Sequence, residues 1–200
     1  MNKVLILYPA EFNCYPKFAR KTSRILQNLK NYSVVFPADA NHLIRRYFEN
    51  LYEVSLIEHA DWNSDNISHA IIFDDGEVFT NELKILKAAE IKIREIHINV
   101  TRVINIKKEK LHTGVVSTSN YEYIGRGSYW GNPYSMYEAG ETRDEVIRKF
   151  AYDFECDKFP NKKKSEVYKL AGKRLGCFCK PEACHGDVLA NYLNSWDDGK

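Results

Sequence analysis

The chain has 200 residues, 44% of them apolar and 28% charged, with five cysteines and a formal net charge of +2. This composition is that of an ordinary globular protein, and the length allows one large α/β domain or two small ones. A charge so near neutral gives no argument for nucleic-acid binding, and the lack of an apolar run of about 18 residues excludes a membrane-spanning helix. With no signal-peptide pattern, we expect a cytoplasmic protein without a membrane partner.

Short apolar strands alternate with amphipathic helices over the first half of the chain. Buried strands are predicted at residues 4–7 and 70–73, and a further strand at residues 33–36; residues 4–7 form a short, continuous apolar run. Such alternation predicts an α/β fold with a parallel sheet and right-handed crossovers. A charge cluster at residues 107–110 then marks a boundary, so we expect one domain over residues 1–110 and a smaller α+β domain over residues 111–200.

The turn after the strand at residues 70–73 is a candidate ligand site. Asp75 and Gly76 lie in this turn, and Thr80 begins the next helix. Anionic ligands bind at the carboxyl ends of parallel strands, beside helix N-termini. We therefore predict ligand binding by Asp75, Gly76 and Thr80, although a plain Asp-Gly turn before a threonine-capped helix would use the same residues.

This turn resembles the D-G-x-x-G-T turn of the Rossmann-like superfamily that contains DNA-processing protein A, the lonely-guy phosphoribohydrolases and the nucleoside deoxyribosyltransferases. The resemblance implies a Rossmann-like domain that binds nucleotides or nucleosides, and several members of that superfamily cleave N-glycosidic bonds. Phe79 stands where the superfamily prefers glycine, and Y-P-A-E-F-N follows the first strand in place of a glycine-containing loop.

Residues 125–134, G-R-G-S-Y-W-G-N-P-Y, form a second candidate site. The glycines permit unusual backbone angles and close approach to a ligand, so we expect Arg126 to pair with a phosphate and Trp130 to stack on a base. A structural turn with Trp130 packed in the core is the alternative. The predicted ligand-binding residues of this loop are Gly125, Arg126, Gly127, Ser128, Trp130 and Asn132.

Three cysteines, a histidine and an aspartate fall within residues 177–187. A strand at residues 175–179 would place Cys177 and Cys179 on one face, and the apolar stripe that follows predicts a helix beginning near Cys184 and His185. Asp187 would lie in the first turn of that helix.

Three interpretations of this cluster stay open. Cys177, Cys179 and Cys184 can bind zinc, with His185 or a water molecule as the fourth ligand. Alternatively, Cys184 is a nucleophile at a helix N-terminus, with His185 as its base and Asp187 as the group that orients the base. In the third interpretation, these are small buried residues in a reducing compartment.

The second half of the chain closely resembles domain of unknown function 4326, a protein family found in bacteriophages, bacteria and some eukaryotes. The resemblance covers residues 100–200 and rests on G-R-G-S-x-W-G-N-P-Y, T-R-D-E-V-I-R-K-F and L-A-G-K-R-L-G-C-F-C-K-P-E-A-C-H-G-D-V-L-A. The family name carries no established reaction. A composition rich in asparagine and lysine suits an AT-rich phage genome, and hence a host cytoplasm.

We therefore expect a nucleotide- or nucleoside-processing enzyme that hydrolyses or transfers at a glycosidic or phosphate ester bond. Arg126 would hold a phosphate, and Asp187 or His185 would act as acid or base. One alternative is a non-catalytic nucleotide sensor or sponge, of a kind that counters host defence. In this alternative, zinc would stabilise the fold. Another is a nucleic-acid-binding module that uses the cysteine cluster and the lysines at residues 162–164. The expectation depends on the glycine loop and the cysteine cluster sharing one pocket.

Overall fold

The computed structural model describes residues 2–51, 53–109, 111–112, 114, 116–137 and 140–199. The chain divides into two compact units, an N-terminal unit that runs to Ile98 and includes the tail from Ser195, and a C-terminal unit from Asn99 to Asn194. The sequence placed its boundary after residue 110. Among the described residues, no helix is long and apolar enough to cross a membrane.

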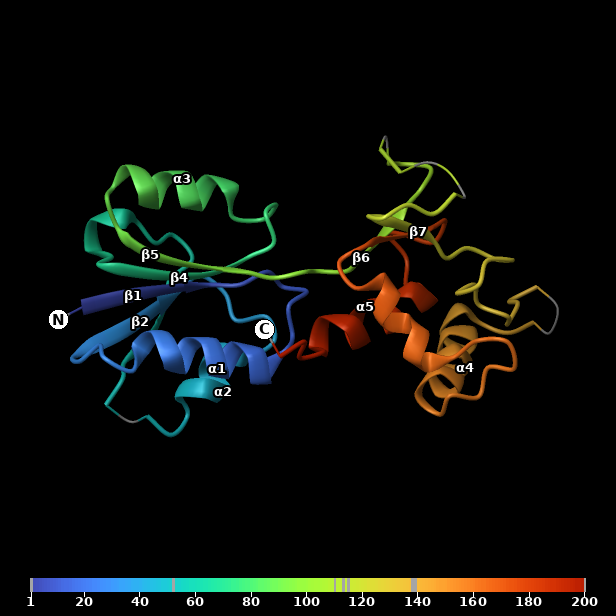
Figure 1. Cartoon of the computed structure of the whole chain (residues 1–200), viewed down its shortest axis with the longest axis horizontal. Coiled ribbons are helices and arrows are strands. Elements are labelled where there is room, and N and C mark those ends of the chain that lie inside the picture. Colours follow the sequence, from blue (N-terminus) through green and yellow to red (C-terminus); the bar gives the residue numbers. More distant parts are fainter. Residues whose placement is uncertain are drawn as a thin grey trace. The chain divides into compact units, whose positions relative to one another are not determined.

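The N-terminal unit is built on a five-stranded parallel sheet of order β3-β2-β1-β4-β5. Its strands are β1 (Asn2–Leu7), β2 (Tyr32–Phe36), β3 (Leu56–Glu58), β4 (His69–Asp74) and β5 (Lys92–His97). Helices α1 (Tyr15–Leu26) and α2 (Leu43–Phe48) cover one face, α3 (Thr80–Ala88) covers the other, and a 3-10 turn, η1 (Ser64–Asn66), precedes β4 (Figure 1). The predicted parallel, Rossmann-like architecture is confirmed.

Continuous apolar runs produce the central strands of this sheet. The side chains of residues 4–7 in β1 and 70–74 in β4 are buried, as strands covered on both faces require. The C-terminal tail belongs to the same unit, because Lys17 binds Asp198 at 2.9 Å and Arg20 binds Asp197 at 2.5 Å. These two ion pairs fasten the end of the chain to α1.

The C-terminal unit contains a three-stranded parallel sheet of order β6-β8-β7. Its strands are β6 (Arg102–Asn105), β7 (Tyr121–Tyr123) and β8 (Arg174–Cys177), and its helices are α4 (Arg143–Glu155), the 3-10 helix η2 (Lys164–Leu170) and α5 (His185–Ser195). α4 begins with a capping box between Thr142 and Glu145, a threonine followed three residues later by a glutamate.

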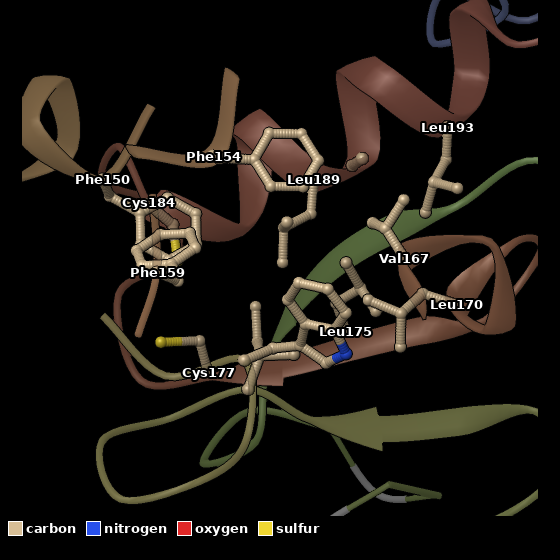
Figure 2. Close-up of a cluster of buried hydrophobic side chains, with 13 residues drawn as sticks. Phe150, Phe154, Phe159, Val167, Leu170, Leu175, Cys177, Cys184, Leu189 and Leu193 are labelled. Carbon is tan, nitrogen blue, oxygen red and sulfur yellow. The ribbon is translucent and has the colours of Figure 1, made fainter. Parts of the chain in front are cut away.

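One cluster of buried side chains forms the core of this unit (Figure 2). Phe150 and Phe154 from α4, Leu175 from β8 and Leu189 from α5 are each at most 1% exposed. Cys177 and Cys184 lie at one end of this cluster in Figure 2, so their sulfur atoms are at the edge of the core.

Candidate functional site

Strand β8 delivers the first cysteine of the cluster. β8 ends at Cys177, two residues earlier than predicted, and Cys179 lies in the loop that follows. The side chains of Cys177 and Cys179 still meet, with their Sγ atoms 3.5 Å apart. Gly176 lets this strand pass close to its neighbour, because a Cβ atom there would lie 2.2 Å from the Tyr121 hydroxyl oxygen.

The start of α5 brings the other two candidate ligands to the same place. Cys184 directly precedes the helix and His185 is its first residue, as predicted. The Cys184 Sγ atom lies 3.7 Å from His185 Nδ1. The ligand atoms of Cys177, Cys184 and His185 all lie within 4.8 Å of one another, and all three residues are buried. This Cys/His cluster can hold a metal ion.

The imidazole of His185 has a fixed orientation. Its Nε2 atom lies 2.9 Å from the carbonyl oxygen of Ile124, and because a carbonyl only accepts, Nε2 must carry the proton. Nδ1 is then unprotonated and faces Cys184. Burial lowers the pKa of His185, so the ring stays neutral.

Asp187 does not orient His185, contrary to the catalytic interpretation. Its Oδ2 atom accepts a hydrogen bond from the backbone N–H of Cys184 at 2.9 Å, and its Oδ1 atom lies 2.6 Å from Lys180 Nζ. A side chain in the third helical position that reaches back to the residue before the helix is half of a capping box. Asp187 therefore caps α5.

Hydrogen bonding among the three thiols sets their acidity. Bonds from Cys177 and Cys184, with a further bond from Arg143, hold the pKa of Cys179 far below its usual range. The bonds to the other two sulfur atoms raise the pKa of Cys184. These interactions do not favour a thiolate at Cys184, which is the nucleophile of the catalytic interpretation.

The glycine loop has a compact structure of its own. Gly127 has φ +82°, and a Cβ atom on Gly131 would lie 2.6 Å from the carbonyl oxygen of Gly125. That carbonyl accepts the hydroxyl of Ser128 at 2.7 Å. Asn132 joins the loop to α4, because its side-chain N–H donates to the carbonyl of Val146 at 3.1 Å. The predicted need for glycine is confirmed at these positions.

Trp130 packs in the core, as the structural alternative for this loop expects. Its indole is 3% exposed and belongs to the core cluster, where its ring centroid lies 6.5 Å from that of Phe154. A ring enclosed in this way has no free face for a base, so the predicted stacking role is not supported.

A pocket of about 310 Å³ lies between the glycine loop and the cysteine cluster. Gly125, Arg126 and Asn132 contribute from the loop, and the three clustered cysteines and His185 contribute from the other side. The remaining wall consists of residues from α4 and the segments beside it, which are Tyr134, Met136, Tyr137, Arg143, Val146, Ile147, Phe178 and Ala183. Gly127, Ser128, Trp130 and Asp187 do not line it.

Arg143 is a pocket residue that the sequence interpretation missed. It follows the capping threonine of α4, donates to the carbonyl of Ala183 at 3.2 Å and lines the same pocket as Cys179. The available signal was its place in the T-R-D-E-V-I-R-K-F segment. With Arg126, whose guanidinium lies 3.3 Å from Ser135 Oγ, it gives the pocket two cationic groups.

Two lysines of the basic run turn toward the protein. Lys162 Nζ donates to the carbonyl of Gly131 at 2.7 Å and lies 4.3 Å from the centre of the Phe159 ring. Lys164 Nζ donates to the carbonyl of Glu155 at 3.1 Å. Lys162 thus supports the glycine loop, and these two ammonium groups are less suited to bind a nucleic-acid backbone.

The predicted site in the N-terminal unit is a turn that is stabilised by hydrogen bonds within it. Asp75 Oδ1 accepts the backbone N–H groups of Glu77 and Val78 at 3.0 and 3.1 Å. Gly76 has φ +83°, which favours glycine. Thr80 begins α3 as predicted. These contacts account for Asp75 and Gly76 as turn chemistry. Thr80 is the first residue of α3 and does not cap it, because the N-cap is Phe79 and no side-chain cap hydrogen bond is made.

Comparisons with known proteins agree with these two halves. A family model described as a minimal SLOG domain matches residues 1–104, and a model described as a domain of unknown function, DUF4326, matches residues 104–195. The two resemblances seen in the sequence are thereby confirmed.

A curated relative comes from Enterobacteria phage T4, where it is named an uncharacterized 12.4 kDa protein in the nrdA-td intergenic region. It is 43% identical over 72 residues, which span 36% of this chain and 65% of the relative, or less than two thirds of its length. No solved structure matches the chain. Because the first family model covers more than half of the chain, this protein belongs to the minimal SLOG domain family, and its second half matches the DUF4326 model.

Proposed function

We propose that the pocket of the C-terminal unit binds a phosphorylated small molecule of the nucleotide class. The observation that carries this proposal is the presence of Arg126 and Arg143 in the wall of one pocket of about 310 Å³. Guanidinium groups match the geometry of phosphate oxygens, and Val146 and Ile147 offer an apolar surface to the rest of the ligand. The Rossmann-like SLOG half is consistent with a nucleotide-related role.

Within this proposal, the activity is hydrolysis or transfer at a glycosidic or phosphate ester bond. A specific observation favours the second candidate, a non-catalytic sensor or sponge. Asp187 is engaged as a helix cap, and His185 donates to a carbonyl, so neither is positioned to move a proton on a ligand. A turnover panel of nucleosides, nucleotides and dinucleotides separates the two, because an enzyme releases product and a sponge binds without product.

Calorimetric titration with adenosine monophosphate and with inorganic phosphate tests the binding itself. Arg126→Ala should weaken binding of a phosphorylated probe by about tenfold or more, since a charge-assisted hydrogen bond contributes about 1.5–3 kcal/mol. The matched control is Arg148→Ala, which removes an exposed arginine of α4, and it should leave the affinity unchanged. Equal affinities for wild type and Arg126→Ala would contradict the proposal.

We also propose zinc as the ion that the Cys/His cluster holds, because zinc prefers thiolate and imidazole ligands. The cluster offers three sulfur atoms and one unprotonated nitrogen, which support this choice of ion. Metal analysis of protein purified without added zinc should give close to one equivalent. Less than about 0.1 equivalent would contradict a site of ordinary structural affinity.

A further inference from the structure

We infer that Cys177, Cys179, Cys184 and His185 form a closed tetrahedral zinc site, in which protein atoms fill all four positions and the metal builds the floor of the pocket. This inference rests on the proposed choice of zinc and goes beyond it. The sequence left open whether the fourth zinc ligand is His185 or a water molecule, and this inference chooses His185. It also assigns the metal a structural role.

Two of the separations between candidate ligand atoms match those of a zinc tetrahedron. Zinc–sulfur bonds of about 2.3 Å and zinc–nitrogen bonds of about 2.0–2.1 Å place neighbouring sulfurs about 3.8 Å apart, and a sulfur and a nitrogen about 3.6 Å apart. The observed separations are 3.5 Å between Cys177 Sγ and Cys179 Sγ, and 3.7 Å between Cys184 Sγ and His185 Nδ1. The atoms of these two pairs are therefore spaced as zinc ligands are.

His185 is prepared to be a ligand through Nδ1. Its Nε2–H donates to the carbonyl of Ile124, and a metal-bound histidine commonly gives its second ring N–H to such an acceptor. The bond fixes both the tautomer and the ring plane. Sequence alone could not show this, because adjacent residues such as Cys184 and His185 diverge on a regular helix, whereas Cys184 lies just before α5.

Cys179 is the residue that closes the site. The other three ligand atoms form a compact triplet, and two cysteines with one histidine would leave a fourth position for water. The Cys179 Sγ atom lies 3.5 Å from Cys177 Sγ, and Cys179 also lines the pocket. We therefore assign it the position that a metal-bound water would take.

Donors around the sulfur atoms suit a thiolate-rich metal. The backbone N–H of Gly186 points at Cys184 Sγ, with a separation of 3.4 Å, and Arg143 lines the same pocket as the three cysteines. Three thiolates and a neutral imidazole around Zn²⁺ leave one net negative charge, which the guanidinium offsets. A closed site of this kind activates no water, so any chemistry in the pocket must come from the wall residues.

Extended X-ray absorption fine structure of the zinc-loaded, full-length protein tests the inference without any substitution. We expect three sulfur ligands at about 2.3 Å and one nitrogen ligand at about 2.0 Å. Two sulfurs together with an oxygen ligand would overturn the closed site while leaving zinc binding intact. A protein that binds no zinc would overturn the choice of metal as well, and neither result would decide whether the pocket binds a nucleotide.

Cobalt substitution provides a second readout that identifies the residue. The thiolate-to-cobalt absorbance should fall by about one third in Cys179→Ser, because one thiolate of three is lost. Cys156→Ser, which removes an exposed cysteine elsewhere in the unit, should leave the spectrum unchanged. Addition of inorganic phosphate to the wild-type cobalt protein should also leave it unchanged. A full-strength band in Cys179→Ser, or a shift with phosphate, would overturn the inference.

Discussion

At the scale of single residues, the region around the start of α5 depends on very close packing. A Cβ atom on Gly186 would lie 2.4 Å from Ile124 Cδ1 and 3.0 Å from Val103 Cγ2. Ile124 is also the residue whose carbonyl holds His185. The glycine therefore lets the helix approach the residue after β7, which positions the histidine.

Replacement of this glycine should disturb both stability and metal binding. We expect Gly186→Ala to lower the free energy of unfolding by about 1–3 kcal/mol, because an extra methyl group overpacks a filled space, and to reduce the zinc content. Chemical denaturation and metal analysis measure the two effects. Gly114→Ala is the matched control, because the nearest atom to its Cβ lies at an ordinary 3.7 Å; equal losses in both variants would contradict the account.

Asp187 permits a test between capping and catalysis. We expect Asp187→Ala to cost about 1 kcal/mol of unfolding free energy, the usual value of a helix cap, because Cys184 N–H loses its acceptor. Asp187→Asn keeps a side-chain oxygen and should retain most of that stability. If Asp187→Asn instead abolished a measured turnover at unchanged stability, Asp187 would be an acid or base and the capping interpretation would be insufficient.

Residue patterns predicted which side chains gather but not what each one contacts. The density of cysteines around Cys177 pointed correctly to a cluster. The roles of Trp130 and Asp187 depended on burial and on competing partners, which appear only in three dimensions. Arg143 was missed because its pocket is formed by segments far apart in the sequence.

At the scale of elements, the sequence predicted the strands that are buried on both faces. It did not predict where the N-terminal unit ends and the C-terminal unit begins. Residues 95–106 look like one alternating strand, yet β5 pairs with β4 and β6 pairs with β8. Between them, Thr101 N–H donates to Asn194 Oδ1 at 2.8 Å, a contact over 93 positions. No local pattern reveals such a change of sheet.

The capping box of α4 makes its stability depend on pH. Hydrogen bonds from the backbone and side chain of Thr142 hold the pKa of Glu145 below its usual 4.5. A carboxyl whose pKa is lowered by folding stabilises the native state above its unfolded pKa, and this contribution is lost as the pH falls through the folded value. We therefore expect the stability difference between wild type and Glu145→Ala to be largest above pH 4.5 and to shrink in stronger acid. Thermal melting of both proteins over a pH series measures this difference. A difference that grows with acidity would show that the cap has another origin.

At the scale of the whole molecule, the candidate metal site belongs to one of two compact units. The candidate ligands all lie in the C-terminal unit. Because a metal stabilises the structure that holds its ligands, we expect a chelator to raise amide hydrogen exchange in β8 and α5. Exchange in the strands β1 and β4 should stay unchanged. Uniform deprotection of both units, or of neither, would contradict the assignment.

Analysis by mass spectrometry of small molecules released from the purified protein tests the shared pocket most directly. The account predicts a phosphorylated compound retained by the wild type, about tenfold less of it from Arg126→Ala, and an unchanged amount from Arg148→Ala. Retained molecules that carry no phosphate, or equal retention by Arg126→Ala, would contradict it.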